Sequence, residues 1–125
     1  MAGVMFTPST YGGADLDIDT GWVDLTLLNG WLNYGGVYPN AAYRMIGGVV
    51  YIRGLIKSGT VTNITPLATL PVGCRPAFDH MSAVTASPGS AFARIDVQAG
   101  GNIVGMMGLV TGWTSITVAP FIAEQ

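Results

Sequence analysis

Aromatic and amide side chains are concentrated in one short stretch of the sequence, where they could form a binding surface. Between residues 22 and 44 the chain carries Trp22, Trp31, Tyr34, Tyr38, Tyr43, Arg44 and three asparagines, Asn29, Asn33 and Asn40. Indole and phenol rings have apolar faces with polar tips, and amides both donate and accept hydrogen bonds. This set fits an uncharged, polyhydroxylated ligand such as a saccharide. It fits a packed subunit interface equally well, because Tyr, Trp and Arg are enriched at interfaces.

The single histidine offers little acid–base chemistry. His80 directly follows Asp79, but the Gly-x-Ser-x-Gly motif of a serine hydrolase does not occur in the sequence. A zinc site cannot be built from this histidine and the single cysteine, Cys74, without carboxylates. The sequence therefore indicates a surface-loop pair, with hydrogen bonding to a ligand at a subunit boundary as the alternative. For Cys74 it indicates a small buried apolar residue.

Three aspartates, Asp15, Asp17 and Asp19, are spaced like the first ligands of a calcium loop. An EF-hand needs Gly at the sixth position and Glu at the twelfth, and these positions hold Thr20 and Thr26. The same spacing describes a strand that exposes its carboxylates on one face. We favour the strand, with a weak cation site as the alternative, and predict no metal centre and no cofactor.

No motif in the sequence predicts an enzyme. Phosphate-binding glycine loops are absent from it. A hydrolase acting on a polysaccharide would need two facing carboxylates roughly 5–10 Å apart. Alternation places Asp24 and Asp96 on outward strand faces, but nothing in the sequence brings them together.

The sequence predicts that the segments carrying these residues form β-strands. Apolar residues alternate with period two in segments 22–27, 50–56, 91–97 and 115–122, and turn-forming pairs such as Asn29-Gly30 separate them. Residues 42–46, Gly47-Gly48 and residues 49–56 predict a hairpin with a two-residue loop. Many short strands with regular turns predict an all-β fold, an antiparallel β-sandwich or barrel almost without helix.

Composition narrows the class of protein further. Of 125 residues only 12 are charged, the net charge is −2, and half of the residues are hydrophobic. A chain of this kind lacks the basic surface of a nucleic-acid binder and is too apolar for a disordered protein. So few charges leave the edges and faces of a β-domain poorly protected, which predicts a closed homo-oligomer that hides one sheet face.

The chain shows no sorting or spanning segment. Its first residues lack the basic and apolar regions of a signal peptide, and the charge-free stretch 97–123 is too rich in Gly, Thr and other polar residues for a membrane span. We expect residues 1–20 to form an irregular lead-in or linker and residues 21–125 to form one domain.

Four segments together resemble a known module. They are Gly21–Trp31 (GWVDLTLLNGW), Gly48–Thr60 (GVVYIRGLIKSGT), Leu70–Pro76 (LPVGCRP) and Ala93–Val97 (ARIDV). The chain resembles, over about residues 20–125, the C-terminal module of tail-fibre, baseplate and receptor-binding proteins of phages that infect mainly Gram-positive bacteria. Cys74 departs from the pattern, since an aromatic residue is more usual there.

The resemblance implies a trimeric head domain, a jelly-roll-like β-sandwich that binds host cell-wall saccharides without cleaving them. Its expected partners are copies of itself, that saccharide and other virion tail proteins, and it would belong to the virion tail or baseplate and act outside the cell. A purely structural virion protein (fibre, neck or capsid decoration) is the alternative. The ligand-binding candidates are Trp31, Tyr34, Tyr43, Arg44, Asp79, His80, Arg94 and Trp113.

Overall fold

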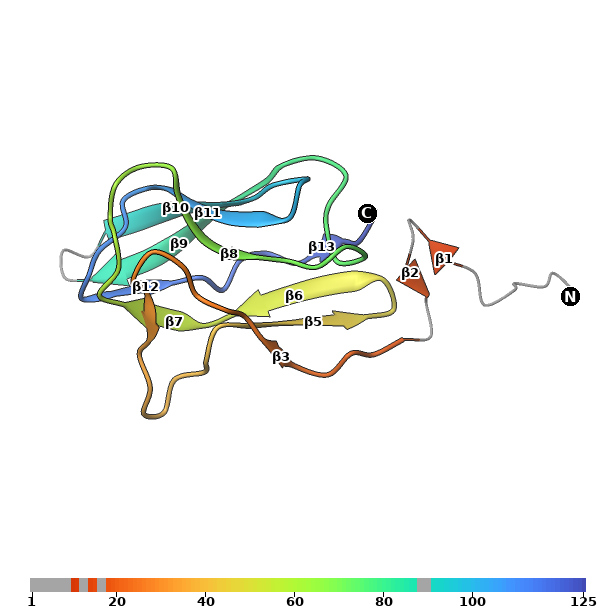
Figure 1. Cartoon of the computed structure of the whole chain (residues 1–125), viewed down its shortest axis with the longest axis horizontal. Coiled ribbons are helices and arrows are strands. Elements are labelled where there is room, and N and C mark those ends of the chain that lie inside the picture. Colours follow the sequence, from red (N-terminus) through yellow and green to blue (C-terminus); the bar gives the residue numbers. More distant parts are fainter. Residues whose placement is uncertain (1–9, 12–13, 16–17, 88–90) are drawn as a thin grey trace, which may run out of the picture.

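The computed structural model describes residues 10–11, 14–15, 18–87 and 91–125, and every regular element in these ranges is a strand (Figure 1). The strands are β1 (Thr10–Tyr11), β2 (Ala14–Asp15), β3 (Val23–Asp24), β4 (Leu32–Asn33), β5 (Ala42–Ile46), β6 (Val49–Arg53), β7 (Leu55–Lys57), β8 (Thr65–Thr69), β9 (His80–Ser87), β10 (Ala91–Val97), β11 (Asn102–Met107), β12 (Trp113–Ser115) and β13 (Phe121–Ile122). The described part contains no helix, and so none long and apolar enough to cross a membrane.

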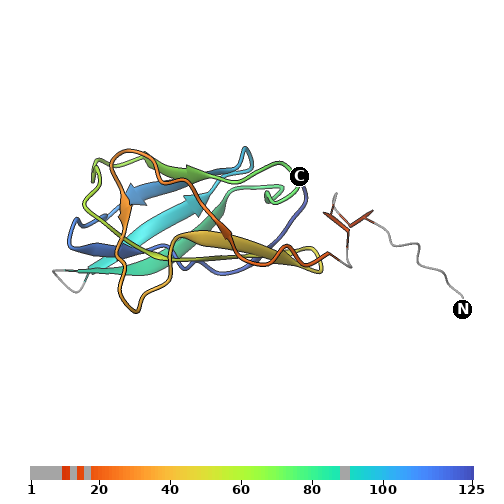
Figure 2. The same ribbon diagram turned by 60° about the horizontal axis from the view of Figure 1, so that its bottom comes forward.

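The strands form two main antiparallel sheets. The seven-stranded sheet has the order β4-β7-β12-β9-β10-β11-β8, and the four-stranded sheet has the order β13-β6-β5-β3. The sheets lie over one another in both views (Figures 1 and 2). Their facing side chains, including Val50 and Ile52 from β6 and Ile95 and Val97 from β10, form one buried cluster. The predicted all-β, antiparallel class is thus confirmed. Strands β1 and β2 pair only with each other.

The hairpin predicted around Gly47-Gly48 is present as β5 and β6. Both glycines have positive φ, 57° and 82°, as a two-residue hairpin turn requires. The predicted second strand, 49–56, was too long. It breaks at Gly54, where the chain leaves the four-stranded sheet and continues as β7 in the other sheet. A Cβ on Gly54 would lie 2.6 Å from the Cα of Ala41, so the crossing requires glycine.

Alternation along β10 places side chains as the sequence predicts, with one correction. Ile95 and Val97 are fully buried in the core, whereas Phe92 is exposed on the outer face. Asp96 faces outward but is not at the surface, since only 3% of it is exposed. Arg94 lies beside it and donates from Nε and Nη2 to its two carboxylate oxygens at 3.0 and 2.9 Å. Asp96 is therefore occupied by an ion pair rather than free for chemistry.

From residue 18 the described chain pairs with the β5–β6 hairpin of the four-stranded sheet. Gly47 donates to the carbonyl of Ile18, and Thr20 donates to the carbonyl of Met45. Most of the predicted lead-in over residues 1–20, Asp17 included, falls outside the described residues. That division of the chain stays a prediction.

Candidate saccharide-binding site

An aromatic pocket of about 320 Å³ opens on the outer face of the seven-stranded sheet. Its lining residues are Tyr34, Tyr38, Leu55, Thr85, Trp113 and Ser115. Three neighbouring strands supply four of them, because β12 pairs with β7 on one side and with β9 on the other. Thr114 points into the core and is fully buried, so the adjacent Trp113 and Ser115 point outward.

A tight turn brings the two tyrosines of this pocket together. Tyr34 directly follows β4, and its amide donates to the carbonyl of Leu55 at 2.9 Å. Gly35 and Gly36 both have positive φ, and Tyr38 donates back to the Gly35 carbonyl at 3.3 Å. The Tyr34 and Tyr38 rings therefore meet edge to face, with centroids 5.4 Å apart and an interplanar angle of 89°.

The aromatic pocket combines ring faces with hydroxyl groups. Two phenols and an indole provide apolar surface, while Thr85 and Ser115 add hydroxyls to those of the tyrosines. The ammonium of Lys57 lies 5.2 Å from the Tyr34 ring centroid. The lining holds no carboxylate, imidazole or thiol. Such a pocket can hold the C–H face of a sugar and bind its hydroxyls.

Two of the eight predicted site residues, Tyr34 and Trp113, meet in this pocket. The sequence analysis noted Tyr38 among the aromatics but did not select it, and it missed Leu55, Thr85 and Ser115. The pair Gly35-Gly36 was a local signal for Tyr38, since a turn there folds Tyr38 back toward Tyr34. No local signal exists for the other three, because only strand order brings them to the site.

Trp31 lies elsewhere, in the core. Only 2% of it is exposed, and its indole packs against Gly59. Two of the three asparagines from the aromatic segment are used by the fold. Asn29 donates to the carbonyl of Pro66, and the side-chain oxygen of Asn33 accepts from the amide of Ala41.

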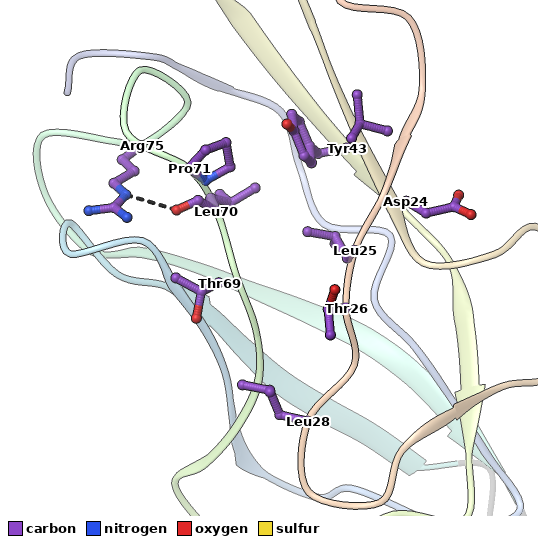
Figure 3. A pocket seen from close by; sticks show the side chains of 10 residues that line it. Asp24, Leu25, Thr26, Leu28, Tyr43, Thr69, Leu70, Pro71 and Arg75 are labelled. Carbon is purple, nitrogen blue, oxygen red and sulfur yellow. Dashed lines mark hydrogen bonds between the residues drawn. The ribbon is translucent and has the colours of Figure 1, made fainter.

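Tyr43 lines a second pocket, of about 400 Å³, between the chain around β3 and the chain around β8 (Figure 3). Leu25, Leu70 and Pro71 contribute apolar surface to it. Burial raises the pKa of Tyr43, and the charge of Cys74 adds a smaller effect in the same direction. The carboxylate of Asp24 turns away from Tyr43 in this view. The structure thus separates Tyr43 from Tyr34 and Trp113.

Arg44 is engaged by Asp19. Its Nε and Nη2 donate to the two carboxylate oxygens at 2.9 and 2.7 Å. This hydrogen bonding, with a further bond from the amide of Gly21, lowers the pKa of Asp19 to about 2. The pairing leaves Arg44 neutralised rather than free for a ligand.

Asp79 and His80 also serve local contacts. Asp79 accepts a hydrogen bond from the amide of Ala99 at 3.0 Å. His80 Nε2 lies 2.9 Å from the carbonyl of Ala119, and its ring centroid is 5.3 Å from that of Phe121. The histidine contacts fasten the start of β9 to the chain before and within β13, and the aspartate contact joins it to the turn between β10 and β11.

Arg94 borders a shallow hollow of about 270 Å³ with Met81, Ser82 and Ala83. In the described residues no three or more His, Cys, Asp or Glu side chains cluster closely enough to hold a metal ion. The aspartate series considered as a calcium loop is not testable on this point, because Asp17 and the side chain of Asp15 lie outside the described part.

No protein-family model and no curated protein sequence matches the chain. Solved structures do match its fold. The receptor binding protein of Listeria phage PSA has a TM-score of 0.69 at 19% identity, covering 88% of this chain and 68% of that one. The head domain of lactococcal phage bIL170 has a TM-score of 0.57 at 23% identity, covering 82% and 96%. The resemblance stated from the sequence is thus confirmed at the level of the fold, since the chain has the fold of receptor-binding domains from phages of Gram-positive bacteria. The jelly-roll topology and the trimer stay predictions.

Proposed function

We propose that this chain is the receptor-binding head of a phage tail fibre or baseplate, and that it binds a host cell-surface carbohydrate without cleaving it. Its likeness in fold to two phage receptor-binding proteins supports host recognition. The aromatic pocket is the single observation that carries the carbohydrate assignment, because Tyr34, Tyr38 and Trp113 offer ring faces beside hydroxyl donors and acceptors.

In this proposal the sugar ring packs on the aromatic walls, while Thr85 and Ser115 bind its hydroxyls. Cleavage would require an acid and a second carboxylate across the glycosidic bond. The lining supplies neither, and Asp96 on the same sheet is held by Arg94. Binding alone is therefore the function that the pocket supports.

We further propose that the head is a homotrimer whose subunits meet through the outer face of the seven-stranded sheet. Phe92 is 73% exposed and Met81 is 63% exposed on this face, and register places the exposed Met107 opposite Arg94. Exposed apolar patches of this kind mark interfaces. Closed symmetry would hide the patch on each copy, and the resemblance favours three copies.

The aromatic pocket and this apolar patch lie on the same sheet face, since Trp113 and Phe92 both point outward from it. A neighbouring subunit covering the patch would come close to the pocket rim. Arg94 would then lie at the subunit boundary. Trp31, Tyr43, Arg44, Asp79 and His80 would support the fold around the site rather than touch the sugar.

A structural virion protein is the second candidate, and the same exposed face favours it. Phe92, Met81 and Met107 would then dock against another tail protein, and the aromatic pocket would be part of that contact. In either case we propose that the protein is part of the virion, with other virion proteins among its partners; as a receptor-binding head it would belong to the tail or baseplate.

A glycan array separates the two functions. We expect the wild-type chain to bind one or a few bacterial surface saccharides, and Trp113→Ala to weaken that binding about tenfold, or about 1.4 kcal/mol. Phe78→Ala is the matched control, because Phe78 is an exposed aromatic outside the pocket. The carbohydrate assignment fails if the wild type binds no saccharide, or if both variants bind as it does.

A further inference from the structure

The outer face of the four-stranded sheet carries an arginine stacked on a tryptophan. The guanidinium carbon of Arg53 lies 3.9 Å from the centroid of the Trp22 ring. Arg53 is opposite Ala42 in the β5–β6 register. Ala42 is outside the core cluster yet only 1% exposed, and the register places it between Arg53 on β6 and Asp24 on β3.

Arg53 differs from the other arginines of the chain. Nε of Arg44, Arg75 and Arg94 each donates to an oxygen at 2.9–3.0 Å. Nε of Arg53 is buried and has no acceptor among the described residues. Arg53 is also absent from the two ion pairs found in that part of the chain.

On the same sheet face, the guanidinium of the neighbouring Arg44 has hydrogen-bond acceptors. It lies 6.0 Å from the Trp22 ring and is paired with Asp19 through two hydrogen bonds. Arg53 also contacts the Trp22 ring, but it has no carboxylate partner among the described residues. Stacking holds a guanidinium in one orientation, and the planar fork of its terminal nitrogens matches the oxygens of carboxylate or phosphate.

We propose that Arg53, Trp22 and Tyr51 form a binding site for an oxyanion, a carboxylate or phosphate group of a ligand. Tyr51 lies two residues before Arg53 on the same face of β6, opposite Arg44 in the register, and is 39% exposed, so its side chain is available to a ligand bound at Arg53. The ligand's oxygens accept hydrogen bonds from the terminal nitrogens of Arg53. The site lies on the sheet opposite to the aromatic pocket, so it does not depend on the saccharide proposal.

Asp24 tests the electrostatic part of this proposal. It is opposite Ala42 in the β3–β5 register, on the same outer face, and makes no ion pair with Arg53. Its negative charge opposes an incoming anion across that short span. Removing the charge of Asp24 therefore strengthens oxyanion binding, whereas removing the charge of Arg53 weakens it.

The experiment is a nuclear magnetic resonance titration of the ¹⁵N-labelled full chain with inorganic phosphate and, separately, with glucuronate, at constant ionic strength. We expect the Arg53 Nε and Trp22 Nε1 signals to shift and saturate with one dissociation constant. Saturation by either anion supports the site and shows whether phosphate or carboxylate is preferred. Saturation by neither, or equal shifts of all four arginine Nε signals, overturns it.

Variants make the result specific to this residue. Arg53→Gln should weaken binding at least about tenfold, and Asp24→Asn should tighten it about twofold to fivefold. Lys57→Gln is the matched control, since it removes one positive charge from the other sheet. Unchanged binding in Arg53→Gln contradicts the proposal. Unchanged thermal unfolding in each variant confirms that the fold is intact.

Discussion

Gly59 lies directly against the indole ring of Trp31. A Cβ added to Gly59 would fall 2.2 Å from the Cγ and Cδ2 atoms of that ring. The two loops are joined beside this contact, because Thr60 donates to the carbonyl of Asn29 from both its amide and its hydroxyl. The missing side chain at position 59 is therefore what allows Trp31 to be buried in the core.

Gly59→Ala is predicted to destabilise the fold by about 1–3 kcal/mol, because the added methyl overpacks a rigid aromatic ring. Urea unfolding followed by circular dichroism measures the loss. Gly100→Ala is the control, since a Cβ there meets nothing within 4 Å. Its effect should stay within about 0.5 kcal/mol. Equal stability of both variants would contradict the packing described for Trp31.

The Arg44–Asp19 pair should give the fold a specific acid sensitivity. The pKa of Asp19 is lowered from its ordinary 3.8 to about 2, mainly by hydrogen bonds from Arg44. A carboxyl group with a lowered pKa contributes stability above its unfolded pKa and loses it as the pH falls toward its folded pKa. The contribution of this pair should therefore fade between about pH 4 and pH 2.

A carboxyl-detected titration by nuclear magnetic resonance checks this prediction. We expect a midpoint near 2 for Asp19 in the wild type and a midpoint close to its ordinary value in Arg44→Gln. A wild-type midpoint near 3.8 for Asp19 would show that the pair does not hold in solution.

The proposed subunit contact predicts a change in mass. Wild-type chain at micromolar concentration should sediment at about 39 kDa, three times its 13.0 kDa. Phe92→Lys places a charge in the centre of the apolar patch and should dissociate the assembly, because a buried unpaired charge is strongly unfavourable. Phe78→Lys should leave the mass unchanged, since Phe78 precedes β9 and lies outside the sheet face. A 13 kDa wild type would refute the contact.

Local features of the chain were predictable from its sequence. The β5–β6 hairpin followed from Gly47-Gly48 between alternating segments, and the burial of Ile95 and Val97 followed from their period of two. Both patterns involve residues that are close together in the sequence, so the local geometry of turns and strands is enough to predict these features. The overall class followed in the same way from many short strands and turns.

Long-range packing decided the features that sequence reasoning missed. The alternation of Val50, Ile52 and Ile56 gives no sign that the chain changes sheets at Gly54. The sequence predicts Trp31 as a ligand-binding candidate, because the space that Gly59 leaves for its ring, 28 positions later, cannot be seen locally. Trp113 and Thr85 reach Tyr34 only through the order β7-β12-β9, which no single segment encodes.

Saccharide binding by the aromatic pocket should depend less on pH than binding at a site that uses carboxylates. Its lining has no carboxylate or imidazole, so saccharide binding should vary less than about twofold between pH 5 and pH 8. Calorimetric titration with the saccharide identified on the array measures this. A larger change in affinity over this range would contradict binding by the aromatic rings and hydroxyl groups of the lining alone.

The most direct test of the function is sedimentation of the labelled protein with purified cell walls of Gram-positive bacteria, before and after periodate oxidation of the wall sugars. The proposed function predicts that the protein sediments with the untreated walls of its host. It also predicts that periodate treatment abolishes this binding and that Trp113→Ala weakens it about tenfold. Equal binding to oxidised walls, or binding unaffected by Trp113→Ala, would contradict recognition of a saccharide by the aromatic pocket.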